Sequence, residues 1–512
     1  MSKLGPLTID LIERGAALNA DRVALVFEDR ELSFAEVNHQ ANQLAHALSF
    51  VGANHRSRVA LLVNNSLVSV PLDFGCVKAG VNRVPLNARL SLEEHARMVT
   101  EAECGILIFS ADLAERAAEL VEKIPSLSAY GLGVSLPDSA DLAAIAADQD
   151  GTPPQIEAAP DDIILTLYTS GTTGVLKAAQ HTQASFAAIC RNILLNLFPI
   201  SQSDAMMHAA SLIHASGTFV LPLWLRGGRS IILSGFVPQE FLSAISHYRP
   251  TAINLVPTML HMLLEQPDMD QHDLSSLNHI IYGASPMPRT VIERAIDIFG
   301  QDKFWQYFGQ TEAPLALAVL RPEDHVGDLL GACGRPAVDV ELRLIDEKGK
   351  EAPQGEPGEI LVRSPSSAAG YFKAPDLSRE SFDADGWVHT RDIGVFDERG
   401  FLFLRDRTSD MIVSGGYNVY PREVEDVLME HDDVLEACVV GAPDAKWVEA
   451  VTAFIVLRPD HQASEADLIS HASEKIASYK KPRRIIFTDS IPKTAVGKVN
   501  RKILREKLQN EG

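Results

Sequence analysis

Hydrophobic and polar positions alternate along the chain in a pattern typical of α/β proteins. Short continuous apolar runs, which favour buried strands, occur at residues 58–63, 163–167, 230–233, 252–256 and 277–282. Apolar positions at helical spacing occur at residues 34–48, 92–101 and 185–197. Because strand and helix patterns follow one another in turn, we predict an α/β fold over most of the chain.

The pattern changes outside these runs. Residues 137–162 are rich in Ala, Asp and Pro and predict a surface connection. Residues 331–404 carry short strand patterns separated by Gly and Pro turns, which favours a small β-barrel. Residues 405–414 have the composition of a boundary, and the stretch after them again mixes strands and helices. At 512 residues, the chain is long enough for two or more domains.

Charge and cysteine usage restrict the function classes. The net charge of −22 argues against nucleic acid as a partner, because a polyanion requires a basic surface. The cysteines show no CxxC spacing and predict reduced thiols; they are Cys76, Cys104, Cys190, Cys333 and Cys438. The first residues are too polar for a secretory signal, and no apolar run is long enough to span a bilayer. We therefore expect a soluble, cytoplasmic protein with no integral membrane association.

A loop rich in glycine and hydroxyl groups directly follows the apolar run at residues 163–167. Its candidate phosphate-binding residues are Thr169, Ser170, Gly171, Thr172, Thr173, Gly174 and Lys177. Glycine lets the backbone approach a ligand, and successive N–H groups and hydroxyls form a concavity that suits phosphate oxygens. A flexible turn is the alternative, but a strand leads into this loop and a lysine ends it. Because the GxxxxGK[ST] spacing is not present, we predict a phosphate loop of another type.

This loop, YTSGTTGVLK, resembles the phosphate loop of the adenylate-forming superfamily, which comprises acyl-CoA synthetases, luciferases and peptide-synthetase adenylation domains. The chain departs from the usual pattern where Leu176 replaces Pro, Ala178 replaces Gly, and Gln183 replaces the His of a Thr-His pair. The resemblance implies a large N-terminal domain, residues 1–407, of two α/β subdomains plus the small β-barrel. It also implies a small, mobile α+β C-terminal domain at residues 408–512.

A second motif, FGQTE at residues 308–312, resembles the family's Tyr-Gly-x-Thr-Glu sequence. A carboxylate beside a hydroxyl can hold a divalent ion that bridges phosphates, although a Thr-Glu pair is more often a solvated turn. The resemblance implies that Thr311 contacts phosphate and Glu312 holds Mg²⁺. It also implies a nucleotide site around adenine, made of Gly283, Ala284, Ser285, Phe308, Gly309 and Gln310, in which Phe308 takes the place of Tyr.

Asp392 and Arg407 resemble the family residues that bind ribose. A carboxylate that accepts two hydrogen bonds suits vicinal hydroxyls, whereas an ordinary surface ion pair is the alternative. Arg391 stands where Gly is commoner, and Ser409 stands where the family hinge has Asp or Lys. A small polar residue can absorb backbone rotation, so we predict a hinge at Ser409.

The resemblance also assigns residues to the acyl and thiol side of the site. Lys498, in a Pro-Lys-Thr-x-x-Gly-Lys motif, matches the catalytic lysine that stabilises charge as a carboxylate attacks the α-phosphate. Gly415 and Gly416 match a loop that lines the pantetheine channel, and a plain helix-entry turn is the alternative. His214 matches a histidine that borders the acyl pocket, although a lone histidine in an apolar stretch is more often a core residue.

Together these motifs are identified as those of the superfamily, and they are most similar to stand-alone AMP-forming acyl-CoA synthetases. The resemblance implies that the chain activates a carboxylic acid with ATP and Mg²⁺ and transfers the acyl group to CoA. An acyl-adenylating enzyme with another acceptor and a non-catalytic nucleotide-binding protein remain as alternatives. We predict a mostly uncharged pocket for an aromatic or medium-chain monocarboxylate, from Ala215, Ser216, Gly217, Phe219 and the run at residues 305–307. The oligomeric state, homodimer included, is left open.

Overall fold

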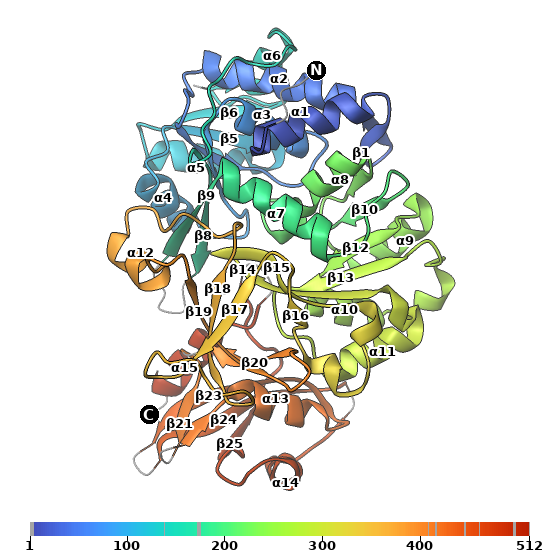
Figure 1. Ribbon diagram of the computed structural model, residues 1–512, viewed down its shortest axis with the longest axis vertical. Helices are drawn as coiled ribbons and strands as arrows, with labels where there is room; N and C mark the ends of the chain where they lie inside the picture. The colour runs from blue at the N-terminus through green and yellow to red at the C-terminus, as the bar shows by residue number, and fades with distance from the viewer. Residues whose placement is uncertain are drawn as a thin grey trace.

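The computed structural model describes residues 5–137, 139–170, 176–407, 409–414, 417–444, 447–459, 461–494 and 498–510. Within these residues the strands form two large sheets, one small sheet and one C-terminal sheet, stacked along the long axis of the molecule (Figure 1). No helix in the described part of the chain is long and apolar enough to cross a membrane. The predicted α/β fold is confirmed.

The first large sheet is mostly parallel and ends in an antiparallel pair. Its strands, in spatial order, are β7 (Ala140–Asp141), β6 (Ser128–Leu132), β5 (Ile106–Ser110), β3 (Arg58–Leu62), β4 (Asn82–Pro85), β8 (Ile163–Ser170) and β9 (Leu176–Thr182). The helices that pack on it are α2 (Phe34–Phe50), α3 (Ser69–Lys78), α4 (Leu92–Glu101), α5 (Ala114–Lys123) and α6 (Leu142–Ala147). The predicted helix at residues 92–101 coincides with α4, which begins with a capping box between Ser91 and Glu94.

The second large sheet has a parallel centre with antiparallel strands at both edges. Its strands are β16 (Arg335–Pro336), β15 (Ala313–Leu320), β14 (Phe304–Gln310), β13 (His279–Gly283), β12 (Ala252–Leu255), β10 (Ala205–His208), β11 (Arg229–Ile232), β1 (Val23–Phe27) and β2 (Arg30–Ser33). One face is covered by α9 (Pro238–Tyr248), α10 (Pro257–Leu264) and α11 (Arg289–Phe299). The other face is covered by α1 (Thr8–Asn19), α7 (Gln183–Asn196) and α8 (Val220–Arg226).

The two remaining sheets follow in the chain. The predicted barrel segment forms an antiparallel sheet of β17 (Glu341–Ile345), β18 (Gly358–Arg363), β19 (Val388–Phe396) and β20 (Leu402–Arg407), in that order rather than as a closed ring among the described residues. The short helix α12 (Pro375–Ser381) lies between β18 and β19 in sequence. The C-terminal sheet contains β22 (Tyr417–Val419), β21 (Ile412–Ser414), β24 (Val448–Leu457), β23 (Val434–Asp444) and β25 (Arg484–Phe487). Its helices are α13 (Pro421–Met429), α14 (Glu465–Lys475) and α15 (Arg501–Asn510).

The segment at residues 137–162 is more than the surface connection that its composition predicts. It contains β7 and α6, and Leu142 and Ala146 are buried against α2 and its neighbours. Asp141 caps α6, because its side chain accepts a hydrogen bond from the Ala143 backbone N–H at 2.9 Å. A six-residue helix gives too few apolar positions to reveal its period, so tertiary burial decides the structure here.

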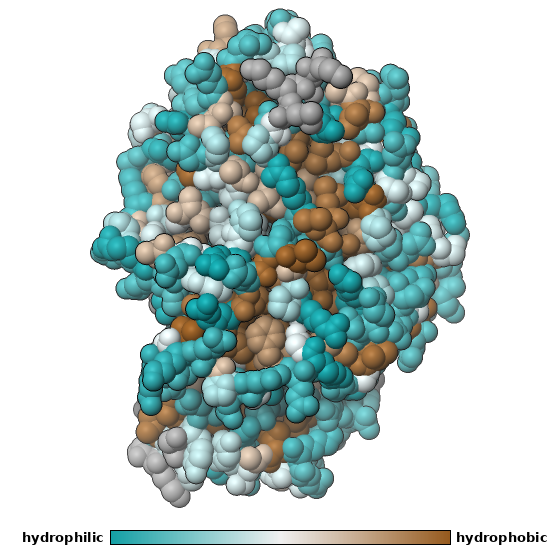
Figure 2. Space-filling view, viewed as in Figure 1, coloured by the Kyte–Doolittle hydropathy of each residue, from teal (hydrophilic) through white to brown (hydrophobic). Residues whose placement is uncertain are grey.

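A tryptophan in α8 joins the helical layer between the two large sheets. The Trp224 ring lies 4.4 Å from the ring of Phe34 and 5.0 Å from that of Phe74, measured between centroids. Its indole N–H donates to the Ile12 carbonyl at 2.8 Å, so the buried polar group is satisfied. Figure 2 shows apolar side chains gathered in a band across the middle of the visible face, over the region of α7 and α8.

Two contacts connect β20 to the start of α13. The Arg422 backbone N–H donates to Asp406 Oδ2 at 3.0 Å, and its guanidinium donates to the Leu404 carbonyl at 3.1 Å. Burial raises the pKa of the Asp406 carboxyl to about 6. These contacts cross the predicted domain boundary after Arg407, which itself stays a prediction.

We expect Trp224→Ala to lower the free energy of unfolding by about 3–5 kcal/mol, because it removes a large buried ring and leaves a cavity. Urea denaturation followed by far-UV circular dichroism measures this loss. Leu195→Ala is the matched control, since the Leu195 side chain in α7 is 60% exposed, and it should change stability by no more than about 0.5 kcal/mol. Equal effects of the two substitutions would contradict the assigned role of Trp224.

Candidate active site

The strands β8 and β9 hold the two ends of the predicted phosphate loop. They pair antiparallel with Thr169 opposite Lys177, and Thr169 Oγ1 donates to the Lys177 carbonyl at 3.5 Å. Lys177 Nζ lies 5.6 Å from the centre of the Tyr371 ring. The predicted residues Gly171, Thr172, Thr173 and Gly174, and the side chain of Ser170, lie outside the described residues. The structure therefore places Thr169 and Lys177 at the ends of the loop.

Glycine is required at two positions where the backbone is crowded. A Cβ on Gly283 would lie 2.5 Å from the Tyr307 carbonyl oxygen, and a Cβ on Gly309 would lie 2.2 Å from that of Leu315. Ala284, directly after β13, has a left-handed φ of 67°, which costs an L-residue about 1–2 kcal/mol. Backbone strain of this kind concentrates at functional sites, in agreement with the role predicted for this turn.

The other predicted adenine-site residues lie on the same two strands or next to them. Phe308 is 8% exposed and belongs to an apolar cluster with Leu317 and Val388, which joins the second large sheet to the four-stranded sheet. Ser285 continues the bend after β13, and Gln310 ends β14 and pairs with Ala313. Phe308 is therefore largely occupied by packing within the protein.

Thr311 and Glu312 are held by residues from distant parts of the chain. The Tyr371 phenol donates to Glu312 Oε1 at 2.6 Å, and the Ala368 backbone N–H donates to the Glu312 carbonyl at 2.8 Å. His181 Nε2 donates to the Thr311 carbonyl at 2.8 Å. None of the residues in the described ranges bonds Glu312 Oε2, so this oxygen is available as a ligand for a cation.

The contacts around Thr311 also explain why Gln183 can stand where the family has the His of its Thr-His pair. Its Oε1 accepts the Ile9 backbone N–H at 3.1 Å, so Gln183 connects the start of α7 to α1, and it is His181, two positions earlier, that bonds Thr311. Burial lowers the pKa of His181, so the imidazole is neutral at neutral pH and its proton lies on the nitrogen that faces the carbonyl. The sequence did not point to His181, because its partner Thr311 lies 130 positions away along the chain.

Asp392 and Arg407 face each other across β19 and β20. They are register partners, and Arg407 Nε donates to Asp392 Oδ1 at 3.1 Å. Asp392 is 4% exposed; burial raises the pKa of its carboxyl, and the Arg407 charge opposes that shift. Arg391 has a left-handed φ of 62°, and its backbone N–H donates to Glu359 Oε1 at 3.1 Å. A left-handed position is one that glycine occupies without strain, which explains why Gly is the commoner residue there.

Lys498 reaches the same cleft from the C-terminal part of the chain. The charges of Asp392, Glu312 and Arg407 all act on its ammonium. Surrounding protein and then Arg407 lower the pKa of Lys498, while the two carboxylates oppose the shift. The Lys498 residue is nevertheless exposed to solvent. A turn fixes its backbone, in which Thr494 N–H donates to the Lys498 carbonyl at 2.6 Å.

His214 lies at the border of this charged group. Burial lowers the pKa of its imidazole to about 4, and the charges of Lys498 and Arg89 act in the same direction. The Asn87 side-chain amide donates to His214 Nε2 at 3.2 Å, which leaves the ring proton on Nδ1. The imidazole is therefore neutral at neutral pH and adds no charge where a carboxylate is expected to enter.

The structure thus brings predicted residues of the second large sheet, the four-stranded sheet and the C-terminal segment together. Those assembled around one cleft are His214, Glu312, Asp392, Arg407 and Lys498. Gly415 and Gly416 lie outside the described residues. Sequence reasoning missed Asn87, His181 and Tyr371 as contacts of the site, since each bonds a partner far away along the chain.

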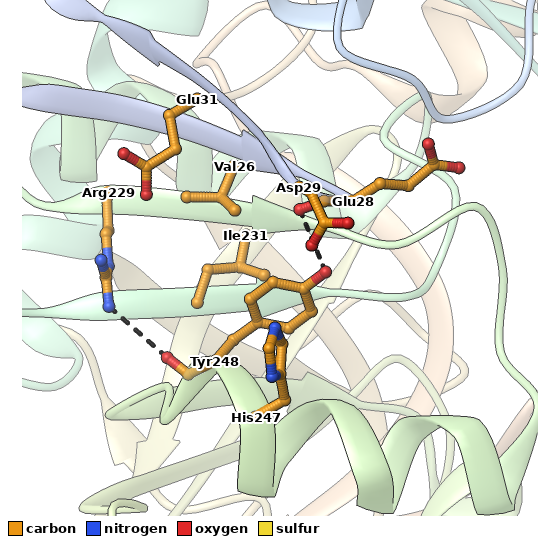
Figure 3. Close-up of a pocket in the computed structure, with 8 residues that line it drawn as sticks. All are labelled: Val26, Glu28, Asp29, Glu31, Arg229, Ile231, His247 and Tyr248. Carbon is orange, nitrogen blue, oxygen red and sulfur yellow. Dashed lines mark hydrogen bonds between the residues drawn. The ribbon is translucent and has the colours of Figure 1, made fainter.

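A cavity of about 320 Å³ lies elsewhere, at the edge of the second large sheet. Figure 3 shows Glu28, Asp29 and Glu31 around it, with the Tyr248 phenol donating to the Glu28 carbonyl at 3.0 Å. None of the predicted site residues lines this cavity. It is therefore separate from the candidate active site.

Comparisons with known proteins identify the family of the chain. The model of the AMP-binding enzyme family matches residues 12–372, and that of the AMP-binding enzyme C-terminal domain matches residues 423–498. The chain is 37% identical to the medium/long-chain-fatty-acid–CoA ligase FadD8 of Mycobacterium tuberculosis, over 98% of this chain and 90% of that protein. It is 33% identical to a feruloyl-CoA synthase of an Amycolatopsis species, over 95% of this chain and 96% of that protein.

Solved structures of similar proteins share the whole fold. The anthranilate CoA ligase AuaEII in complex with anthranoyl-AMP superposes with a TM-score of 0.91 at 30% identity, covering 98% of this chain and 97% of that one. The amide bond synthetase McbA of Marinactinospora thermotolerans has a TM-score of 0.90 at 30% identity, covering 98% and 99%. From the matched residues and the full-length similarity, this chain belongs to the AMP-binding enzyme family, the adenylate-forming superfamily that its motifs predict.

Proposed function

We propose that this chain is an AMP-forming acyl-CoA synthetase for an aromatic or medium-chain monocarboxylic acid. The observation that carries the proposal is the position of Lys498, which lies in the cleft with Asp392 and Glu312 and so faces the predicted ATP site. The activities named for the similar proteins bear out the prediction of an acid–thiol ligase that uses ATP, Mg²⁺ and CoA. The identity of the acid is inferred separately, from the residues of the predicted acyl pocket.

The chemistry explains why a cation must enter the cleft. A carboxylate oxygen attacks the α-phosphorus of ATP, the bond to pyrophosphate breaks, and an acyl-adenylate forms. Both reactants are anionic, so their approach requires positive charge; the Lys498 ammonium supplies it, and although burial and Arg407 lower its pKa, Asp392 and Glu312 oppose that shift. The CoA sulfur then attacks the acyl carbon as a thiolate, and AMP leaves with the bonding electrons.

The remaining assignments follow from the contacts around ATP. Glu312, whose Oε2 has no partner in the described part of the chain, would hold Mg²⁺, which supplies charge neutralisation at the phosphates when bound. Asp392 and Arg407 would bind the ribose hydroxyls, and Thr169 and Lys177 the phosphates. The protein's own contribution is to fix these groups before ATP arrives, so that little reorganisation accompanies the reaction.

Domain rotation would separate the two half-reactions. We place the boundary after Arg407 and the hinge at Ser409, with residues 1–407 holding the acyl and ATP sites. The catalytic lysine belongs to residues 408–512, so rotation would withdraw Lys498 and open a path for CoA. Gly415 and Gly416 would line that path.

We place the acyl pocket beside His214, next to the face of the second large sheet. Apolar side chains from η2 (Ala215–Phe219), β14 and β15 meet there, among them Phe219, Tyr307 and Leu315. Below them, Ser216 Oγ lies 3.0 Å from His208 Nδ1, and His208 Nε2 has no partner among the described residues. Burial lowers the pKa of His208 to about 4, so this imidazole is neutral at neutral pH and adds no charge beneath the predicted pocket.

A non-CoA acceptor is the second candidate. The fatty acid–[acyl-carrier-protein] ligase ScoC of Streptomyces coeruleorubidus is 34% identical over 95% of this chain, and the amide bond synthetase McbA shares the fold. The adenylation half of the site is compatible with either acceptor, because it does not touch the thiol. We favour CoA from the names of the other relatives.

A pyrophosphate-release assay over aliphatic and aromatic acids, with and without a ring hydroxyl, tests the proposal. Products are identified by mass in the presence and absence of CoA. Turnover that requires CoA and yields an acyl-CoA supports the synthetase and names the acid. Acyl-AMP that accumulates without thioester would favour another acceptor, and ATP binding without turnover would favour the non-catalytic alternative. Cell fractionation tests the proposed cytoplasmic location, and light scattering distinguishes a monomer from a homodimer.

We expect Lys498→Ala to reduce acid-dependent pyrophosphate release at least about 10²-fold, because it removes a charge that acts in the transition state. Thioester formation from supplied acyl-AMP should fall far less, since that step contains no phosphoryl transfer. Lys493→Ala is the matched control: it lies in the same motif, but its side chain pairs with Glu436 at 2.8 Å. Equal losses in both half-reactions of Lys498→Ala would contradict the assigned role.

The lowered pKa of Lys498 predicts the pH dependence of adenylation. Only the ammonium form is useful, so pyrophosphate release should decline on the alkaline side at a pH below the ordinary lysine value of about 10.4. In Lys498→Arg the guanidinium stays charged, so the residual rate of this variant should not decline over the same range. Single-turnover pyrophosphate release from pH 7 upward measures both profiles without CoA. If the rates of the natural protein and of Lys498→Arg declined at the same alkaline pH, a group other than Lys498 would be responsible for the decline.

A further inference from the structure

We propose that Tyr371 is a positioning residue that orients the side chains of Glu312 and Lys177 for the binding of ATP-Mg²⁺. No motif in the sequence pointed to this residue. The inference rests on the proposed function and extends it to the strand-like segment at residues 368–372. One side chain touches both candidate phosphate-site groups: its O–H donates to Glu312 Oε1 at 2.6 Å, and its ring lies 5.6 Å below Lys177 Nζ.

The hydrogen bond fixes which carboxylate oxygen faces the phosphates. Because Oε1 accepts from the phenol, the Glu312 carboxylate cannot rotate freely, and Oε2 is the oxygen left for a cation. Burial, followed by the Glu312 charge, raises the pKa of Tyr371, so the phenol keeps the proton that it donates. Hydrogen bonds to an ionised acceptor are among the strong ones in proteins, which makes this an effective restraint.

A second hydroxyl lies beside the phenol. The Ser381 side chain, at the end of α12, is 3% exposed and favours the ionised form of the Tyr371 phenol. When this serine donates to the phenol oxygen, the phenol proton is directed at Glu312 and the three groups form a chain of donors. Ser378, one turn earlier in α12, accepts the Tyr371 backbone N–H at 2.9 Å.

Backbone contacts connect the same segment to the strand that follows the phosphate loop. Tyr371 forms a bridge with Ala179, and Phe372 N–H donates to the Ala178 carbonyl at 2.9 Å. Ala368 N–H donates to the Glu312 carbonyl at 2.8 Å. Figure 1 shows α12 beside β8 and β9, at the rim where the loop begins and ends. The distance between Glu312 and Lys177 is therefore set by residues 368–372.

The cation–π contact gives Tyr371 a second effect. A lysine over an aromatic face is attracted by about 0.5–1 kcal/mol at an exposed site. Lys177 is thereby held near the loop, where a free lysine side chain would sample many rotamers. Removing only the hydroxyl separates this ring contact from the hydrogen bond to Glu312.

Tyr371→Phe provides that separation, because it keeps the ring and deletes the donor. We expect the Mg²⁺ concentration for half-maximal pyrophosphate release to rise about tenfold, the scale of one hydrogen bond to a charged group. Calorimetry of ATP binding, in excess Mg²⁺ and in EDTA, supplies a readout other than turnover. The gain in ATP affinity that Mg²⁺ gives the natural protein should shrink about tenfold in Tyr371→Phe, whereas affinity in EDTA should stay the same.

Two further variants complete the test. Ser381→Ala should reduce the Mg²⁺-dependent gain in the same direction by a smaller factor, because it frees the phenol without removing it. Tyr248→Phe is the matched control, since its phenol donates to the Glu28 carbonyl far from the cleft, and it should leave the gain unchanged. An unchanged Mg²⁺ gain in Tyr371→Phe, or a loss of ATP affinity in EDTA of equal size, would overturn the proposal. The calorimetry needs no acid substrate, so its result is distinguishable from a failure of the acyl-CoA assay.

Discussion

Two carboxylates and two cations must stay together in one cleft, and the rest of the structure depends on this requirement. Asp392 is almost completely buried, and a buried carboxylate is costly unless a cation pairs with it. Arg407 provides that partner in the next strand, and Lys498 brings the second cation from the C-terminal segment. The Asp392–Arg407 pair lies within one sheet, whereas Lys498 comes from the C-terminal segment, so its charge helps to specify how that segment meets the rest of the chain.

The topology of the sheets explains how these charged residues are brought together. Parallel pairing brings the C-terminal ends of β13 and β14 to one edge of the second large sheet, and Tyr371 links Glu312 at this edge to Lys177 of the first large sheet. The antiparallel four-stranded sheet then contributes Asp392 and Arg407 from strands that pair directly. Crowded glycines and a left-handed alanine lie at these ends, as expected where the backbone must approach a ligand.

Much of this could be predicted from the sequence, and the exceptions have a common cause. Strand and helix patterns predicted the fold class, and continuous motifs predicted the family. The role of each site residue stays a prediction that the geometry supports. Contacts such as Tyr371 with Glu312 or Asn87 with His214 join segments 59 and 127 positions apart, and no local pattern encodes such a pair. The helix α6 was missed for a related reason, because its burial against α2 outweighs a weak local pattern.

The contacts between Asp406 and Arg422 have a consequence for proton linkage. Burial raises the pKa of the Asp406 carboxyl to about 6 in the present arrangement. If the C-terminal domain rotates at Ser409, Asp406 would become solvated and its pKa would fall toward the ordinary aspartate value of about 3.9. The present arrangement would then bind the proton more tightly than the rotated one. Mild acidification would therefore shift the population toward the arrangement that holds Lys498 in the cleft, and alkalinity would shift it toward release.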